Sequence, residues 1–166
     1  MAAGAAADPV RVMFLCLGNI CRSPTAEYVF RKRAEAAGLK VKVASSGTAS
    51  YHVGDSAYGA MVAAARAKGY DMSPHAAQQI AAEHFEEFDL IIAMDSSNLS
   101  DAKRRFGARG EKKLRLFLRD YAPECGTTDT PDPYYERNFG TVVDLVEKGS
   151  DGLIAAILAG KEPPRG

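Results

Sequence analysis

The order of predicted elements indicates an α/β fold: a single-domain, doubly wound, four-stranded parallel sheet with helices on both faces. Four short apolar runs, each with the length of a buried strand, alternate with longer segments of helical periodicity. The 166 residues suffice for one domain with one hydrophobic core. The sequence has no internal repeat, no interdomain linker and no apolar run as long as a membrane span.

The first half of the chain contains two predicted strands. The first strand covers residues 10–15, and a loop over 16–22 follows it. Ser23 is the expected N-cap of the first helix, Pro24 its first residue and Gly38 its end. The elements that follow are predicted to be a strand from Val41 that ends at residues 45–47, an Ala-rich helix over 57–68 and a short helix near 75–82.

The second half continues the alternation. The last helix contains Gly149 and Gly152, which are candidate positions for a bend. We expect residues 1–9 and 161–166 to be tails around a domain of residues 10–160. The predicted elements are a strand over 88–94, a helix from Asp95 to about Phe106, a strand over 113–117, an irregular segment over 119–137 with three of the eight prolines, and a helix over 138–159.

The composition excludes several classes of function. Twenty-one basic side chains balance twenty-one acidic ones, so no overall field favours a nucleic acid or a membrane as partner. Three histidines and three cysteines without ligand spacing predict no metal site, and nothing indicates a cofactor. The odd number of cysteines and the absence of a signal-peptide pattern favour a reducing compartment, and we expect the cytoplasm.

The loop after the first strand contains Cys16 and, six residues later, Arg22. Ligands of doubly wound sheets bind beyond the carboxyl ends of the strands, which is where this loop lies. An ordinary thiol has a pKa of about 8.5, and a helix N-terminus and an arginine favour its reactive thiolate form. The guanidinium of Arg22 can hold two phosphate oxygens at once. The two residues alone favour a buried strand-end cysteine and a surface arginine. The preceding strand, the glycine within the loop and the helix start after it reverse this preference and favour a phosphate site.

The other residues of the loop suit the same chemistry. Gly18 allows a close approach of the backbone, and Asn19 tolerates a left-handed conformation. The hydroxyl of Ser23 can donate to a leaving sulfur. Backbone N–H groups that curl around an anion form a nest. The predicted phosphate-binding residues are therefore Leu17, Gly18, Asn19, Ile20, Cys21 and Ser23.

Residues 12–27 closely resemble the signature of the low-molecular-weight protein tyrosine phosphatases. The resemblance continues, in order, at residues 45–48, 51–54, 93–99 and 131–135, and it extends from about residue 10 to 160. It implies hydrolysis of phosphotyrosine and small aryl phosphates through a phosphocysteine on Cys16. The implied partners are phosphotyrosine-containing proteins, with inorganic phosphate or other oxyanions as product or inhibitor. A monomer is expected.

Asp132 lies between Pro131 and Pro133, a setting that by itself is typical of a turn aspartate. The resemblance implies that Asp132 is the general acid, which protonates the leaving group and then acts as base on water. It also implies that Tyr134 and Tyr135 form a wall of the substrate cleft, although packing in an aromatic corner is the alternative. We expect Tyr51 or its neighbour His52 to form the opposite wall.

The resemblance also suggests residues that support the loop. Asn19 and Ser45 match a pair that holds its strained shape, and His75 and Asp95 match a pair that braces it. Ordinary turn, helix-start and N-cap roles are the alternatives. Cys21 matches a cysteine that protects the nucleophile through a reversible disulfide; a small buried thiol is the alternative. Cys125 receives no role.

Three other functions are compatible with parts of the pattern. A phosphoarginine phosphatase of the same scaffold typically has threonine at the position of Ile20 and phenylalanine in the acid loop, where this chain has Tyr134. An arsenate reductase requires resolving cysteines late in the chain, and Cys125 stands alone there. A phosphate-carrier or anion-binding domain would not need Asp132 or an aromatic cleft. The phosphotyrosine phosphatase accounts for the largest number of these features.

Overall fold

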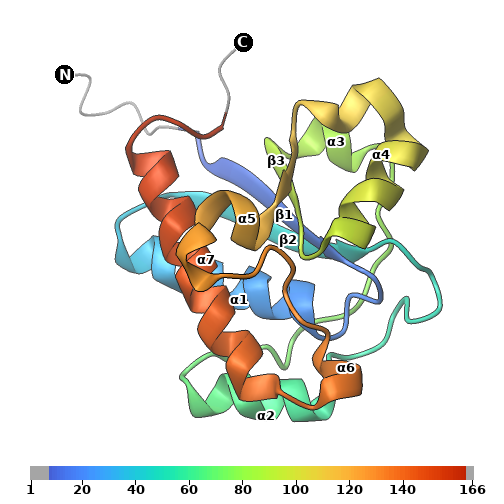
Figure 1. The fold of residues 1–166 in the computed structure, drawn as a ribbon, viewed down its shortest axis with the longest axis vertical. Coiled ribbons are helices and arrows are strands. Elements are labelled where there is room, and N and C mark those ends of the chain that lie inside the picture. The colour runs from blue at the N-terminus through green and yellow to red at the C-terminus, as the bar shows by residue number, and fades with distance from the viewer. Residues whose placement is uncertain (1–7, 164–166) are drawn as a thin grey trace.

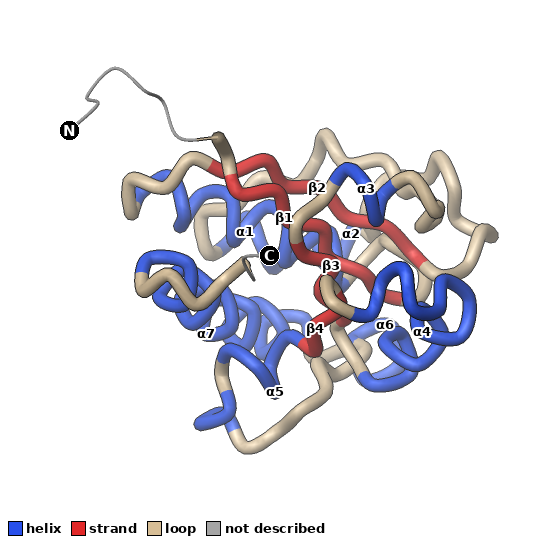
Figure 2. Tube along the Cα trace, turned by 90° about the horizontal axis from the view of Figure 1, so that it is seen from above, coloured by secondary structure: helices blue, strands red, loops and turns tan. Residues whose placement is uncertain are grey.

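The computed structural model describes residues 8–163 and has four parallel strands in one sheet. Their order is β2-β1-β3-β4, as the view in Figure 2 shows. The predicted α/β fold with its parallel sheet is confirmed. Residues 1–7 and 164–166 of the two predicted tails lie outside the described residues. The strands are β1 (Val10–Cys16), β2 (Val41–Gly47), β3 (Leu90–Ala93) and β4 (Leu114–Leu116).

Helices cover both faces of the sheet (Figure 1). Those at residues 22–36, 117–121 and 139–158 pack on one face, and those at 84–87 and 96–111 pack on the other. None within residues 8–163 has the length and apolar character to cross a membrane. The helices are α1 (Arg22–Ala36), α2 (Gly59–Ala67), α3 (His84–Glu87), α4 (Ser96–Glu111), α5 (Phe117–Tyr121), the 3₁₀ turn η1 (Pro123–Cys125), α6 (Pro133–Glu136) and α7 (Phe139–Leu158).

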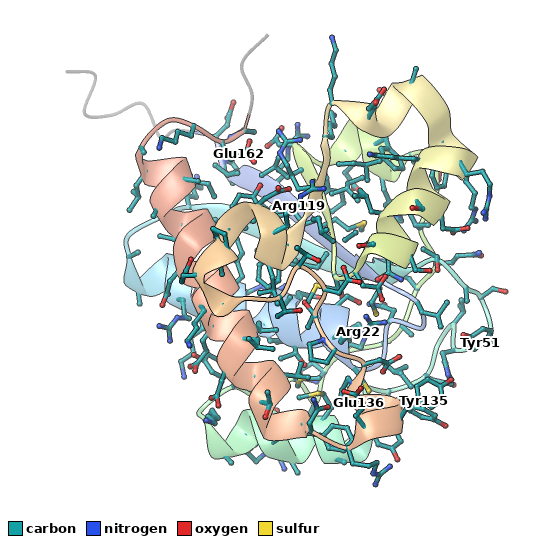
Figure 3. The ribbon with its side chains drawn as sticks, in the orientation of Figure 1. Arg22, Tyr51, Arg119, Tyr135, Glu136 and Glu162 are labelled. Atoms are coloured by element: carbon teal, nitrogen blue, oxygen red, sulfur yellow. The ribbon has the colours of Figure 1, made fainter. Side chains whose placement is uncertain are left out.

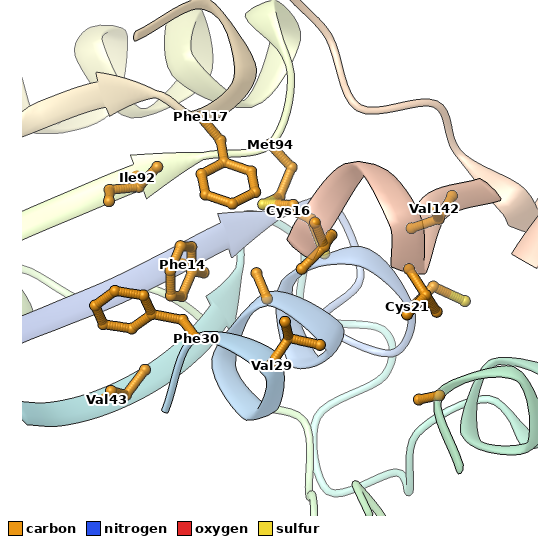
Figure 4. Close-up of a cluster of buried hydrophobic side chains, with 14 of the residues drawn as sticks. Phe14, Cys16, Cys21, Val29, Phe30, Val43, Ile92, Met94, Phe117 and Val142 are labelled. Carbon is orange, nitrogen blue, oxygen red and sulfur yellow. The ribbon is translucent and has the colours of Figure 1, made fainter. Parts of the chain in front are cut away.

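The central strand β1 divides the core into two layers. Successive side chains of a strand point to opposite faces, so Phe14 enters the layer under α1 and α7 while Met13 and Leu15 enter the layer under α3 and α4. Phe14 packs edge-on against Phe30 and Phe117, with ring centroids 5.7 and 5.4 Å apart (Figure 4). Both layers hold β1 firmly, and β1 leads directly into the Cys16 loop.

The first helix begins at Arg22, two residues earlier than predicted. Its N-cap is Cys21, which makes no side-chain capping bond, and Pro24 is the third helical residue. The Ser23 hydroxyl is turned toward the loop, so the predicted N-cap role of Ser23 is wrong. The predicted end at Gly38 is correct: this glycine has φ +80°, and the N–H of Leu39 bonds the carbonyl of Ala34 in a Schellman motif.

The predicted short helix near residues 75–82 is absent, and the first helical residue of this region is His84. Residues 76–80 are extended instead because they bond to their neighbours. Ile80 N–H donates to the carbonyl of Gly47, and Gly47 N–H donates to the carbonyl of Gln78. Tertiary hydrogen bonds to the end of β2 thus override the helical composition of this Ala-rich segment.

The segment 119–137 is less irregular than predicted, because it contains the end of α5, the turn η1 and all of α6. Helix α7 continues through Gly149 and Gly152 without interruption. Both glycines permit a close approach of α5. A Cβ at residue 149 would lie 2.4 Å from the Phe117 ring, and one at residue 152 would lie 1.7 Å from the carbonyl oxygen of Tyr121.

Candidate active site

Cys16 is the last residue of β1 and lies between the ends of β2 and β3. Its side chain is buried, with 3% exposure. The loop that follows curls back over the sulfur: the N–H of Asn19 donates to Sγ at 3.2 Å, and the Ser23 hydroxyl lies 2.9 Å from it. Gly47 of β2 is the register partner of Cys16. A Cβ at residue 47 would lie 2.7 Å from the carbonyl oxygen of Leu17. The loop therefore packs directly on the glycine at the end of β2.

The backbone of the loop presents unpaired donors. Within the described part of the chain, no protein acceptor bonds the N–H groups of Leu17, Gly18, Ile20 or Cys21. Asn19, with φ +59°, is in the left-handed region and turns the chain at the centre of the loop. Successive free N–H groups around such a turn form a nest for an anion, next to the N-terminus of α1.

The side chain of Asn19 holds this strained turn in place. Its Nδ2 donates to the hydroxyls of Ser23 and Ser45 at 2.8 and 2.9 Å, and its Oδ1 accepts from the N–H of Gln78. The carbonyl oxygen of Asn19 lies 2.7 Å from Nε2 of His75. The structure thus brings three of the predicted supporting residues, Asn19, Ser45 and His75, into one buried network.

Sequence reasoning missed two members of this network, Gln78 and Glu27. The Ser45 hydroxyl donates to Oε1 of Glu27 at 2.6 Å, and Arg31 donates to Oε2 at 2.6 Å. The spacing of Glu27 and Arg31 resembles an ordinary surface pair on a helix, which conceals its buried role. Gln78 contributes a backbone N–H, which has no signal in the sequence.

Arg22 links the nucleophile loop to two distant segments. Its Nη1 lies 2.6 Å from Oδ2 of Asp95 and donates to the carbonyl oxygen of Thr130 at 3.2 Å, whereas its Nη2 lies 3.6 Å from Oδ2 of Asp132. Burial lowers the pKa of Arg22, and the adjacent Cys16, Asp95 and Asp132 more than offset burial, so the pKa is raised overall. Asp95 is also the N-cap of α4, so one carboxylate both caps this helix and bonds Arg22.

Asp132 lies at the mouth of the site. It is the N-cap of α6, and its Oδ1 accepts from the N–H of Tyr134 at 3.1 Å. The side chain is 30% exposed, in contrast with 4% for Arg22. The carboxylate is therefore held beside the guanidinium but in reach of solvent.

The predicted catalytic and wall residues surround one cavity of about 270 Å³. Tyr51 and Tyr135 are 66% and 75% exposed and form its outer edge, whereas Arg22 lies deeper (Figure 3). Tyr134 packs edge-on against Tyr135, and His52 packs in the same way against Tyr51. The cavity thus has the Cys16 sulfur and the Arg22 guanidinium at its base and aromatic rings at its rim.

The second cysteine of the loop, Cys21, is a buried free thiol, and Cys16 and Cys125 are also free. Burial, together with the nearby Cys16 and Asp132, raises the pKa of Cys21 to about 12. Among the described residues, no group of three or more His, Cys, Asp or Glu side chains is arranged to hold a metal ion.

Comparison with known proteins places this site in a family. Residues 11–162 match the model of the low molecular weight phosphotyrosine protein phosphatases. The chain belongs to this family. This phosphatase is 36% identical to the low molecular weight protein-tyrosine-phosphatase YfkJ of Bacillus subtilis, over 92% of its own length and 99% of that protein. It is 42% identical to a Streptomyces coelicolor member, over 89% and 93% of the two chains.

Solved structures agree with this assignment. The phosphatase superposes on the crystal structure of YfkJ with a TM-score of 0.88 and 35% identity, over 95% of this chain and 100% of that one. It also superposes on a protein tyrosine phosphatase from Entamoeba histolytica, crystallised with Hepes in its active site, with a TM-score of 0.86 and 34% identity. This superposition covers 92% of this chain and 99% of that one. As a member of this family, the chain is a protein-tyrosine phosphatase and therefore a hydrolase.

Proposed function

We propose that this phosphatase hydrolyses phosphotyrosine in proteins, and small aryl phosphates, through a phosphocysteine intermediate on Cys16. One observation supports this most strongly. The Cys16 sulfur, the Arg22 guanidinium, the free N–H groups of the loop and the Asp132 carboxylate all face a single cavity. A nucleophile, an anion cradle and a proton donor are thereby combined in one cavity.

In the first step, the Cys16 thiolate attacks phosphorus in line with the ester oxygen. The S–P bond forms as the O–P bond to the phenol breaks, and the phenol oxygen takes a proton from Asp132. Arg22 and the loop N–H groups hold the equatorial oxygens, where negative charge is concentrated in the transition state. Nη2 of Arg22 faces Asp132 at 3.6 Å, whereas Nη1 is bound to Asp95 at 2.6 Å.

In the second step, a water molecule attacks the phosphocysteine. Asp132, now ionised, accepts the proton of this water, the new O–P bond forms and the S–P bond breaks. The sulfur leaves as a thiolate, which the Ser23 hydroxyl and the Asn19 N–H stabilise from 2.9 and 3.2 Å. Inorganic phosphate is released and Asp132 is again protonated.

The aromatic rim supports phosphotyrosine as the substrate. Tyr134, Tyr135 and Tyr51 stand above the phosphate cradle, so a phosphate must be carried on a long, flat group to reach Cys16. A phosphotyrosine ring can stack between such walls, and the shorter phosphoserine cannot fill them. Ile20 and Tyr134 also argue against phosphoarginine as the substrate, because phosphoarginine phosphatases typically have threonine and phenylalanine there.

The decisive experiment replaces the nucleophile. Cys16→Ser should lower the release of phosphate from a phosphotyrosine peptide and from p-nitrophenyl phosphate by at least about a thousandfold, because a serine hydroxyl stays protonated. Cys125→Ser, at the partly buried cysteine of η1, is the matched control and should retain activity. Circular dichroism tests whether each variant is folded. Substantial turnover by folded Cys16→Ser would refute the proposed mechanism.

A further inference from the structure

A second cavity, of about 420 Å³, opens beside the catalytic cleft. Ile20, His52 and Tyr134 line both cavities, so the two are continuous along the aromatic wall. The second cavity extends from these shared residues to Asp55 and Tyr58, in the segment before α2. The second cavity therefore lies within reach of a residue next to a phosphotyrosine that occupies the cleft.

The lining of this cavity has a definite chemistry. Asp55 provides a carboxylate that is 59% exposed, with one oxygen 3.0 Å from Nδ1 of His52. Tyr58 and Tyr134 provide two phenol rings, edge-on with centroids 5.3 Å apart. No lysine or arginine is among the described residues that line it. A carboxylate beside aromatic rings is the complement of a cationic side chain.

Arg137 already binds one of these rings through its guanidinium. Arg137 donates to the hydroxyl of Tyr58 at 3.0 Å, with its guanidinium carbon 5.9 Å from the centre of that ring and 5.4 Å from the ring of Phe139. Arg137 is bound at the hydroxyl end of Tyr58 and is not part of the cavity lining. The described lining of the cavity therefore places no arginine or lysine against Asp55.

The cavity on the opposite side of the cleft lacks this character. It has a volume of about 430 Å³ and shares Leu17 with the cleft. Its one carboxylate, Asp101, is paired with both Arg104 and Arg105. The charge of Asp101 is thus balanced within the protein, whereas the one ion-pair partner of Asp55 among the described residues is the imidazole of His52. The two sides of the cleft therefore differ in the charge that they present to a substrate.

We propose that the His52–Asp55–Tyr58–Tyr134 cavity is a substrate subsite that binds an arginine or lysine side chain next to the phosphotyrosine. The proposal rests on the proposed function, because the subsite is defined by a phosphotyrosine in the cleft. Arginine is the preferred occupant: its planar guanidinium stacks on phenol rings and forks onto a carboxylate. The subsite gives this phosphatase a preference for basic sequences around its target tyrosine.

The test compares phosphotyrosine peptides that carry Arg, Lys, Ala or Glu immediately before or immediately after the phosphotyrosine. At one of the two positions, kcat/KM for Arg should exceed that for Ala by about fivefold, with Glu below Ala. In Asp55→Asn the Arg-to-Ala ratio should fall below about twofold. Because this ratio compares two substrates of the same enzyme, any effect of the substitution on catalysis cancels.

Asp144→Asn is the matched control: Asp144 lies on α7, is 54% exposed and pairs with Lys68, so its removal changes the net charge equally. Its ratio should equal that of the unmodified enzyme. A unit ratio at both positions in the unmodified enzyme, an unchanged ratio in Asp55→Asn, or an equal fall in Asp144→Asn would overturn the subsite. Failure of the proposed function itself has a different signature, namely phosphate release that survives Cys16→Ser.

Discussion

The hydroxyl oxygen of Ser23 lies 2.9 Å from the sulfur of Cys16 and accepts a hydrogen bond from Nδ2 of Asn19 at 2.8 Å. Since the Asn19 amide is the donor, the single hydroxyl hydrogen of Ser23 is left for another acceptor. The candidates are the sulfur and, at 3.3 Å, the carbonyl oxygen of Ser46. The shorter contact directs the hydrogen toward Cys16, where it stabilises negative charge on sulfur.

Ser23→Ala should therefore slow the step in which sulfur leaves phosphorus. A hydrogen bond to a charged group contributes about 1.5–3 kcal/mol, which corresponds to a loss of about 10- to 100-fold in kcat. Rapid-mixing kinetics with p-nitrophenyl phosphate should reveal a larger burst of p-nitrophenol, because the intermediate accumulates. Ser100→Ala, at an exposed position of α4, is the control. A change in KM alone would contradict this role of Ser23.

Asp132→Ala should affect substrates according to their leaving groups. Phenolate is a poor leaving group and needs the proton, so phenyl phosphate should lose about 100-fold or more in kcat/KM. p-Nitrophenolate departs without assistance, so p-nitrophenyl phosphate should lose about tenfold or less. Both rates come from phosphate release by one preparation of the variant. Equal losses on the two substrates would show that Asp132 is not the acid.

Gly47→Ala should displace the Cys16 loop, because the loop backbone packs directly on Gly47. The added methyl group would meet the backbone of Leu17 and Gly18, which cannot move without displacing the anion cradle. We expect a loss of about 1–3 kcal/mol in the free energy of unfolding and at least about a tenfold loss of kcat/KM. Gly140→Ala, on α7 with no heavy atom within 4 Å of its added carbon, is the control and should not reduce stability. Urea titration and the phosphatase assay provide the two measurements.

Cys21 should act as a reversible guard for Cys16. Mild peroxide converts the Cys16 thiolate to a sulfenic acid; Cys21 sulfur then attacks it, the S–S bond forms, and the hydroxyl departs with the thiol proton as water. The raised pKa of Cys21, about 12, keeps this thiol protonated at neutral pH, so iodoacetamide should spare it. Mass spectrometry should detect a 16–21 disulfide, and dithiothreitol should restore activity. Cys21→Ser should instead oxidise irreversibly; recovery equal to that of Cys125→Ser would contradict the guard role.

The sheet and the position of the Cys16 loop were predictable because their signals are local. Four apolar runs separated by helical periodicity leave few alternatives to a parallel sheet, and a proline marks the start of the helix that follows the loop. The supporting network is different, because it is assembled from distant backbone groups. The Thr130 carbonyl that holds Arg22 and the Gln78 N–H that holds Asn19 exist in every residue type, so no pattern of side chains reveals them.

The incorrect predictions have the same origin. Serine is a typical N-cap residue, but the hydroxyl of Ser23 contacts the Asn19 amide and the Cys16 sulfur instead. The helix therefore begins without a side-chain cap. Residues 75–82 have a helical composition, but the end of β2 offers them hydrogen bonds that require an extended chain. Contacts remote in sequence decide the conformation of residues 75–82, and hydrogen bonds within the loop decide that of Ser23; both outweigh an intrinsic preference of less than about 1 kcal/mol per residue.

The two glycines of α7 have a consequence for the genetics of this enzyme. They allow α5 to lie against α7, and the chain leaves α5 directly into the segment that ends at Asp132. A methyl group at residue 149 or 152 would push α5 outward and shift the origin of that segment. Loss-of-function alleles are therefore expected in the middle of a helix that contributes no side chain to the cleft, and a mutational map restricted to the cleft would overlook them.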